Sequence, residues 1–457
     1  DYNASKHYCM DDTDVADRLG DLPDSLLQVI ISLLGFRQAV QTGVLSRRWR
    51  NLWRGVPVVD IDEREFAGDG QTWDRFEDFV DHALTSIPPG TRLDAFRLHV
   101  VSCDTATSSR WIRRGLRHLP VAVSIHGTNA GHSLVSWKPH VSSPPPNPFS
   151  YAAADGLWQQ RGMSACAAGF TSRLTTLRLV GASISFGFFQ HLGRYCPTLQ
   201  ELHAERCMMH LLSLASPVLR RLTVIAPLSA LTAAVVPGLE APRLASLRLD
   251  IMYGGESSFE FIAGLGLAPR YHLPALTEAS LRLTDMAADV HLPAHQAWEN
   301  QKLKFLESMS GFLALLNNVV SLHLHGFITM ALLQKESQEF PVLNNLTNLH
   351  LEECDVGVNY QVLTSILRNT PNLEKLALHR CTFEAPPITT NRRKETASSE
   401  CHGSTTPTVF WCKKLKSIEI KCTKEDETHM ARVLSEISKG MAPEQWERVK
   451  TSDTMLH

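Results

Sequence analysis

One short apolar pattern, L-x-x-L-x-L, recurs nine times between residues 174 and 420 and constrains the fold more than any other feature of the chain. The segments are LTTLRL (174–179), LQELHAERC (199–207), LRRLTV (219–224), LASLRLDIM (244–252), EASLRLTDM (278–286), VVSLHLHGF (319–327), LTNLHLEEC (346–354), LEKLALHRC (373–381) and LKSIEI (415–420). Their central apolar residues are Leu177, Leu202, Leu222, Leu247, Leu281, Leu322, Leu349, Leu376 and Ile418. Each segment predicts a strand whose apolar side one unit cannot bury alone. Stacked units bury it together, which predicts an extended array with a continuous core.

The spacing and the ending of the segments identify the repeat class. Successive central residues are 25, 20, 25, 34, 41, 27, 27 and 42 positions apart. Most of these steps fit the 20–29 residues of a leucine-rich repeat, and the longer ones require loop insertions. Three segments end in Cys207, Cys354 or Cys381, where this repeat has Asn or Cys. Segments 187–197 and 359–371 end at prolines and are typical of the returning helices. We therefore expect an α/β fold with a curved leucine-rich-repeat solenoid.

The segment Leu22–Trp53 carries more apolar side chains than a module of its size can bury. If residues 24–34 form a helix, their apolar side chains cover roughly 200° of its circumference, whereas a helix on one core needs about 100°. Further helices are expected over FRQAVQTGVL and SRRWRNLWRGVP, the last with Ser46 as its N-cap. The excess apolar surface favours contact with a partner protein. The simpler alternative is that these residues pack against the first repeat.

Length and composition exclude several classes. At 457 residues the chain exceeds one ordinary core. It is 44% hydrophobic and 20% charged with a net charge of −2, so it lacks a strong field toward nucleic acid or anionic membranes. We find no apolar run of about 18 residues that would span a bilayer, and no signal-peptide core near the start. The ten cysteines do not have the spacing of a disulfide scaffold. We expect a reduced protein that is cytoplasmic, nuclear or both.

The N-terminal segment resembles a known motif. LPDSLLQVIISLL followed by AVQTGVLSRRWRNLW is similar to the F-box, and the whole layout resembles plant F-box/leucine-rich-repeat proteins. The C-terminal segment KCTKEDETHMARVLSEIS resembles the FBD tail of that family. The resemblance implies that the F-box binds a Skp-type adaptor within a cullin–RING ubiquitin ligase. It also implies that the repeats capture the protein to be ubiquitinated.

The resemblance assigns candidate adaptor-binding residues by position. Those expected to contact the adaptor are Leu22, Pro23, Leu26, Leu27, Ile30 and Ile31. Those expected to divide between the interface and the core of the module are Val44, Leu45, Trp49, Leu52 and Trp53.

The expected organisation follows from the motif, the repeats and two polar insertions. It comprises a disordered segment (1–18), the three-helix F-box (19–58), degenerate first repeats (59–125), a proline-rich loop insertion (126–170), leucine-rich repeats (171–385), a disordered insertion (386–408), and a last repeat with the FBD-like segment (409–457).

Two polar columns should line the outward face of the array, because strand side chains alternate. The first is expected to contain Arg178, His203, Thr223, Arg248, Arg282, His323, His350, Ala377 and Glu419, and Arg221 lies in the neighbouring column. Arginine and histidine hold anionic groups by charge-assisted hydrogen bonds. We therefore take as candidate substrate-binding residues Arg178, His203, Arg221, Arg248, Arg282, His323 and His350. The alternative is a polar ladder that only keeps the sheet soluble.

Catalytic and metal chemistry find little support in the sequence. We find no standard protease, hydrolase, phosphate-loop or dinucleotide motif, so we expect no enzyme activity and no cofactor. Cys196, His203, Cys207 and His210 match no standard zinc spacing, and we predict no metal site. The arginines of SRRWR are typical of a solvated helix face rather than of a nucleic-acid site.

These observations together predict a non-catalytic substrate-recognition subunit of an SCF-type cullin–RING E3 ubiquitin ligase. The alternative is a leucine-rich-repeat scaffold that binds proteins without directing their degradation.

Overall fold

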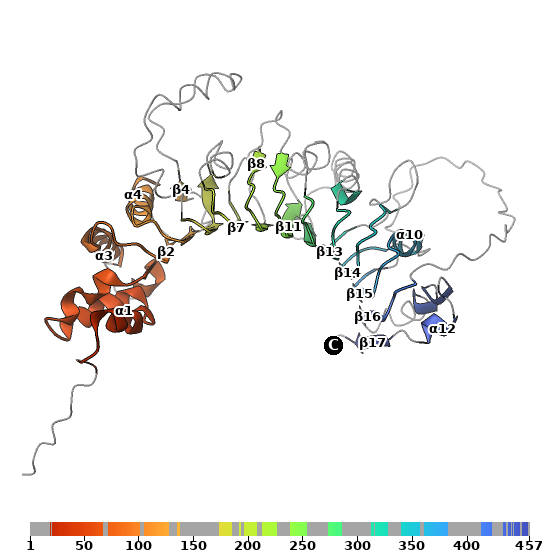
Figure 1. The fold of residues 1–457 in the computed structure, drawn as a ribbon, viewed down its shortest axis with the longest axis horizontal. Helices are drawn as coiled ribbons and strands as arrows, with labels where there is room; N and C mark the ends of the chain where they lie inside the picture. Colours follow the sequence, from red (N-terminus) through yellow and green to blue (C-terminus); the bar gives the residue numbers. More distant parts are fainter. Residues whose placement is uncertain are drawn as a thin grey trace, which may run out of the picture.

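A computed structural model shows a mixed α/β chain in which N-terminal helices precede one long parallel sheet. It describes residues 19, 21–66, 72–100, 105–127, 135–137, 173–184, 192, 196–207, 213–225, 238–253, 273–285, 312–314, 316–327, 340–356, 361–382, 413–422, 433–435, 437–439, 441, 443–447 and 450–455. The sheet is open and curved, and its strands follow the inner side of the curve, with α4 and α10 on the outer side (Figure 1). No helix in the described ranges is long and apolar enough to cross a bilayer.

The 13 strands of the main sheet are neighbours in space in the same order as in the sequence. They are β1 (Val58–Asp62), β2 (Ala95–His99), β3 (Ala122–His126), β5 (Thr176–Val180), β7 (Glu201–Glu205), β9 (Arg221–Ile225), β11 (Ser246–Tyr253), β12 (Glu278–Asp285), β13 (Ser321–His325), β14 (Asn348–Glu352), β15 (Lys375–His379), β16 (Ser417–Cys422) and β17 (Lys450–Met455). Two small parallel pairs join β4 (Val135–Trp137) to β6 (Ala182–Ile184) and β8 (Ser213–Ala215) to β10 (Gly238–Glu240).

The helices are short. The α-helices are α1 (Asp24–Ser32), α2 (Phe36–Gln41), α3 (Thr72–Ser86), α4 (Thr105–Leu116), α10 (Gln361–Asn369) and α12 (Pro443–Trp446), and the 3-10 helices are η1 (Thr42–Val44), η2 (Trp49–Gly55) and η3 (Glu63–Phe66). The third helix predicted for the N-terminal module is therefore 3-10 rather than α. The returning helix predicted over 359–371 is α10, whereas most of the one predicted over 187–197 lies outside the described residues.

The predicted central leucines form one buried line across the sheet, with one exception. Leu222 pairs with Leu247, but Leu247 then pairs with Ala279, not with Leu281. In this repeat Leu276, Ala279 and Leu281 occupy the three pattern positions, and all three are buried. The prediction of Leu281 as the central residue was wrong because alanine replaces leucine there. A shift of two residues keeps every side chain on its face, so the pattern alone did not show the error.

Cysteine ends three repeats in the way the sequence predicts. Cys207, Cys354 and Cys381 are buried. Each thiol donates to a carbonyl of the preceding repeat at 3.4 Å, namely that of Leu179, Leu324 and Leu351 respectively. The residue before each cysteine has a positive φ, which turns the chain off the strand. The cysteines are thus small core residues with a weak donor, as expected.

The array begins earlier than the first clear repeat. Strands β1, β2 and β3 pair in parallel and join β5, so the predicted degenerate repeats belong to the same sheet, and β1 adds a strand that the sequence did not indicate. Strand β4 lies within the segment 126–170 that was predicted as a loop, where a three-residue strand is too short for a pattern to reveal. The expected insertion 386–408 and the segment 1–18 lie outside the described residues.

The N-terminal helices share their core with the start of the array. Phe36 of α2 contacts Trp53 and Phe79 edge-to-face, each at 6.1 Å between ring centroids. The guanidinium of Arg37 lies 4.2 Å above the centre of the Phe66 ring. The buried residues of both parts form one continuous cluster. The N-terminal helices are therefore packed against the array and do not form a separate domain on a linker.

Asp81 fastens α3 to α4, and its loss should destabilise this junction. Its carboxylate accepts the indole N–H of fully buried Trp111 at 2.8 Å and contacts Arg110 at 3.2 Å. Asp81→Ala leaves the buried indole N–H without this acceptor, so we expect the free energy of unfolding to fall by about 2 kcal/mol. Urea denaturation followed by tryptophan fluorescence measures this loss.

Asp60→Ala is the matched control for Asp81→Ala. It removes a carboxylate from an exposed pair with Arg97 at 3.1 Å, which is worth about 0–1 kcal/mol. Equal losses for the two variants would contradict the role given to Asp81.

Candidate functional site

Helix α1 carries apolar side chains on two sides. Leu27 and Ile31 face inward and have no exposed surface. Leu26, Val29 and Leu33 point outward and are 50%, 53% and 83% exposed. A helix that serves one core does not need this second set. The exposed apolar side of α1 is therefore a candidate surface for contact with a partner.

Exposed apolar residues concentrate in the N-terminal module. Among the described residues, ten large apolar side chains are exposed, and eight of them fall between residues 19 and 45. We call these eight the apolar face: Leu19, Leu26, Val29, Ile30, Leu33, Leu34, Val44 and Leu45. Concentrated exposed apolar surface on a soluble protein marks an interaction site. The other two, Val320 and Val342, lie in the repeats.

The predicted adaptor-binding residues divide into three groups. Exposed are Pro23, Leu26, Ile30, Val44 and Leu45; half-buried are Leu22 and Trp49; buried are Leu27, Ile31, Leu52 and Trp53. Leu27 and Ile31 have no exposed surface in this structure, which argues against the predicted contact with the adaptor, and that contact stays a prediction. Both belong to the core of the module, as do Leu52 and Trp53, for which the core was one of two predicted places.

The sequence prediction also omitted four residues of the apolar face: Leu19, Val29, Leu33 and Leu34. A signal for two of them was present. Once Leu27 and Ile31 are assigned inward at a spacing of four residues, Val29 and Leu33 lie on other sides of the helix. The prediction listed only residues that match named positions of the F-box pattern, and Val29 and Leu33 are not among those positions.

The outward face of the sheet is polar, and several of its charged side chains are paired with one another. Glu205 accepts His203 at 3.3 Å and lies 3.5 Å from Arg178. Arg221 pairs with Glu201 of the neighbouring strand. Burial lowers the pKa of His203, which favours its neutral form. Three candidate substrate-binding residues are thus already engaged by carboxylates of this chain, which weakens the case for them as free anion ligands.

Arg248 and Arg282 are exposed but do not share a column as predicted. Arg248 pairs in register with Ser280, and Arg282 pairs with Asp250 one step further along. In-register positions across the sheet form two columns. The first column contains Arg248, His323 and His350. The second column contains Arg282, Glu352 and His379. The placement of Arg282 in the first column was wrong for the same reason as Leu281. Among the described residues, neither arginine forms an ion pair.

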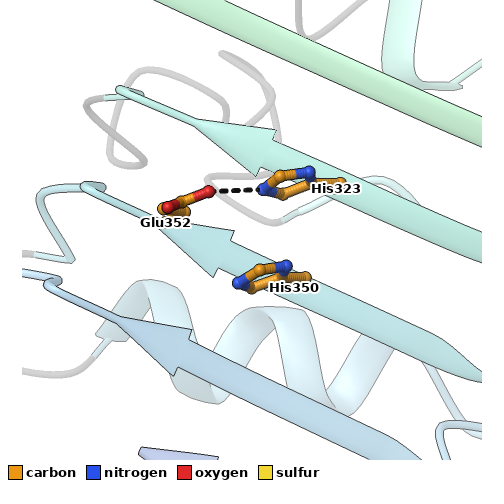
Figure 2. A group of neighbouring side chains, drawn as sticks. All are labelled: His323, His350 and Glu352. Carbon is orange, nitrogen blue, oxygen red and sulfur yellow. Dashed lines mark hydrogen bonds and ion pairs between the residues drawn. The ribbon is translucent and has the colours of Figure 1, made fainter. Parts of the chain in front are cut away.

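A cluster of histidines occupies β13, β14 and β15, and Figure 2 shows its members His323 and His350 beside Glu352. The rings of His323 and His350 stack with centroids 4.2 Å apart and planes at 5°. His323 Nε2 lies 3.1 Å from Glu352 Oε2, and His350 Nε2 lies 2.8 Å from His379 Nδ1. The register explains this proximity, because His323 pairs with His350, and Glu352 pairs with His379.

Burial and mutual repulsion disfavour a charge on His350. The pKa of His350 falls to about 4, first because burial disfavours the charged ring and then because charge on His323 and His379 would repel it. Burial also raises the pKa of Glu352, but positive charge on His325, His323 and His350 outweighs this, and the net change is a lowered pKa. At neutral pH the cluster combines uncharged His350 with a carboxylate.

The cysteine–histidine set weighed for zinc does not form a site of thiolate ligands. Burial raises the pKa of the Cys196 thiol to about 12 and that of Cys207 to about 11. The Cys207 thiol donates to the Leu179 carbonyl, and His203 faces Glu205. His210 lies outside the described residues.

An N-terminal helical module with an open apolar face, fused to a parallel strand array of leucine-rich pattern, defines an F-box protein with repeats. Residues 19–60 match the F-box domain family. The chain is 38% identical over 451 residues to MEIOTIC F-BOX protein MOF of Oryza sativa subsp. japonica, covering 94% of this chain and 85% of that protein. It therefore belongs to the plant F-box/leucine-rich-repeat family.

Further relatives come from Arabidopsis thaliana. F-box/LRR-repeat protein At2g42730 is 29% identical over 385 residues, covering 79% of this chain and 76% of that protein. F-box/FBD/LRR-repeat protein At5g53840 is 48% identical over 67 residues, covering 15% of this chain and 14% of that protein.

Proposed function

We propose that this chain is a substrate-recognition subunit of an SCF-type cullin–RING E3 ubiquitin ligase. The apolar face of residues 19–45 carries the proposal, because it gives the F-box an open surface on which a Skp-type adaptor would dock. The same eight residues would then be buried in the complex. The chain itself would act as a non-catalytic adaptor, and ubiquitin transfer would be the work of other subunits.

The strand array would act as a leucine-rich-repeat solenoid that captures the target. Its outward face is polar and lies on the inner side of the curve, where a bound protein is partly enclosed (Figure 1). Because the helices share one core with the array, a captured target would be held at a fixed position relative to the adaptor. Proximity would raise the effective concentration of target lysines near the transfer enzyme.

Binding of the 457-residue chain to a purified Skp-type adaptor tests the proposal. We expect a one-to-one complex in size-exclusion chromatography with light scattering. A folded chain that forms no complex would favour the alternative, a repeat scaffold that binds proteins without directing their degradation. Turnover of a bound target that depends on the proteasome distinguishes the two functions after adaptor binding is established.

Charge reversal at Arg248 and Arg282 should abolish target capture while adaptor binding is kept. Both side chains are exposed on the outward face, and neither is tied to a carboxylate among the described residues. In the double variant Arg248→Glu with Arg282→Glu we expect at least a tenfold loss of proteins crosslinked to the array. Quantitative mass spectrometry after crosslinking in a plant extract measures the loss.

Arg243→Glu is the control for the charge reversal. Arg243 is exposed in the turn that precedes β11, so its reversal makes the same kind of charge change once, half that of the double variant, without altering the outward face. Capture that survives the double variant, or that is lost equally with Arg243→Glu, would contradict a role for the two arginines.

The name of the rice relative ties that protein to meiosis. We therefore propose reproductive tissue as the first source of extract in which to seek targets, with the chain acting in the cytoplasm, the nucleus or both.

A further inference from the structure

We propose that His323, His350 and Glu352 form a binding site for a divalent transition-metal ion of the zinc class. These residues occupy neighbouring strands β13 and β14 on the outward face (Figure 2). One ligand atom from each residue lies within 4.8 Å of the other two. The proposal does not depend on the ligase function, since it concerns the array alone.

The geometry of the cluster is close to that of a metal site. Zinc bonds to histidine and carboxylate are about 2.0–2.2 Å long in a tetrahedral site, which separates neighbouring ligand atoms by about 3.3–3.5 Å. His323 Nε2 lies 3.1 Å from Glu352 Oε2. The two imidazoles are stacked with their planes parallel to within 5° and point to the same side. A lone pair lies in the plane of its ring, so the two rings must tilt toward each other before all three ligands reach one ion.

The neighbours of the cluster supply what metal sites usually have around them. His379 Nδ1 lies 2.8 Å from His350 Nε2, beside the three-residue group. Its other nitrogen lies 3.3 Å from Glu419, and a carboxylate behind a histidine orients the ring toward a metal. Arg380 contacts Glu352 Oε1 at 2.7 Å, which leaves Oε2 directed at His323. Arg380 therefore holds the carboxylate in place, with Oε2 directed at His323 and 3.7 Å from His325 Nδ1.

The donor set selects the ion. Imidazole nitrogen suits zinc, copper, nickel and cobalt, whereas magnesium and calcium prefer oxygen ligands throughout. A set of two or three imidazoles and one carboxylate matches zinc sites in which histidine supplies most of the ligands. The side chains of His323 and Glu352 are 34% and 24% exposed, so the ion would be reachable from the inner side of the array. A bound ion would place two positive charges on the surface proposed to capture targets.

Metal titration of the full-length chain tests the site, using protein without a histidine tag and stripped with a chelator. We expect one equivalent of Zn²⁺ to bind in calorimetry and Co²⁺ to give the visible absorption of a tetrahedral site. His350→Gln and Glu352→Gln should each weaken Zn²⁺ binding by about 100-fold, since loss of a supporting residue alone costs 10–100-fold. Circular dichroism checks the fold of each variant. If a variant unfolds, the Co²⁺ spectrum of the wild type alone tests the proposed site.

His203→Gln provides the matched control. His203 and Glu205 on β7 repeat the arrangement of His350 and Glu352, but the strand partners of His203 are Arg178 and Thr223 instead of a second histidine. This variant should bind Zn²⁺ like the wild type. The proposal is overturned if the wild type gives no tetrahedral Co²⁺ spectrum, if folded His350→Gln and Glu352→Gln variants bind like the wild type, or if His203→Gln weakens binding equally.

Discussion

Replacing Leu33 and Val44 by aspartate is expected to abolish adaptor binding while the fold stays intact. These are the two most exposed residues of the apolar face, at 83% and 87%. Aspartate there would place two unpaired carboxylates in an apolar interface, so we expect the dissociation constant to rise at least about 100-fold, equivalent to about 2.7 kcal/mol. Exposed substitutions change folding stability by about 0.5 kcal/mol or less. Calorimetry with the purified adaptor measures the first effect and thermal unfolding the second.

A matched pair separates the apolar face from exposed valine in general. Val29 of α1 and Val342 of the repeats are both 53% exposed. Val29→Asp should weaken adaptor binding and Val342→Asp should leave it unchanged. Leu27→Ala, by contrast, empties a buried position and should lower stability by about 2–5 kcal/mol. Normal adaptor binding by the Leu33/Val44 double variant would rule out the apolar face as the docking site.

Gly326→Ala should destabilise the array by about 3 kcal/mol. Gly326 follows β13 with φ +75°, a left-handed conformation that costs other residues roughly 1–2 kcal/mol. A Cβ at this position would also lie 2.2 Å from the carbonyl oxygen of Leu283, so the backbone of β12 or β13 must move. Such overpacking typically costs a further 1–3 kcal/mol. A lower melting temperature and urea midpoint are the expected observations.

Arg206 is the control for Gly326. It takes the equivalent position after β7 with φ +47° and already carries a Cβ. Arg206→Ala should therefore change stability by less than about 1 kcal/mol, since only an exposed side chain is lost. If the glycine variant were as stable as the arginine variant, the close approach to Leu283 would not constrain this turn.

The sequence predicted the parallel array because each repeat buries its own leucines against its neighbours. Leu177, Leu202 and Leu222 lie in one line across the sheet as the pattern requires. The prediction was wrong at β12, where Ala279 takes the place of a central leucine. Alternation has a period of two, so a shift of two residues leaves the same side chains buried. Only the hydrogen-bond register distinguishes the two alignments.

The N-terminal site was predicted as a module but not residue by residue. The motif identified which segment is the F-box, yet it did not separate inward Leu27 and Ile31 from outward Val29 and Leu33. That separation depends on what packs against α1, namely η2, which pattern reasoning cannot place. The orientation of a helix follows from its tertiary contacts rather than from its own composition.

The histidine cluster was only half visible in the sequence. His323 and His350 stand at the same position of successive repeats, so their pairing was predictable. Glu352 and His379 stand two positions further along their strands, and their approach depends on side-chain direction across the sheet. From the sequence, the two histidines were therefore predicted as anion ligands, and the metal that was weighed was placed on other residues.

The continuous core between the F-box and the array limits how the chain can be dissected. A truncated chain that starts after residue 60 would lose the cover that Phe36 and Trp53 provide over Phe79 and His82, and β1, the edge strand of the main sheet, would be cut. Such a truncation would remove the proposed adaptor site and damage the proposed target site together. Genetic separation of the two proposed roles therefore requires surface point substitutions, and a phenotype caused by domain deletion would not distinguish them.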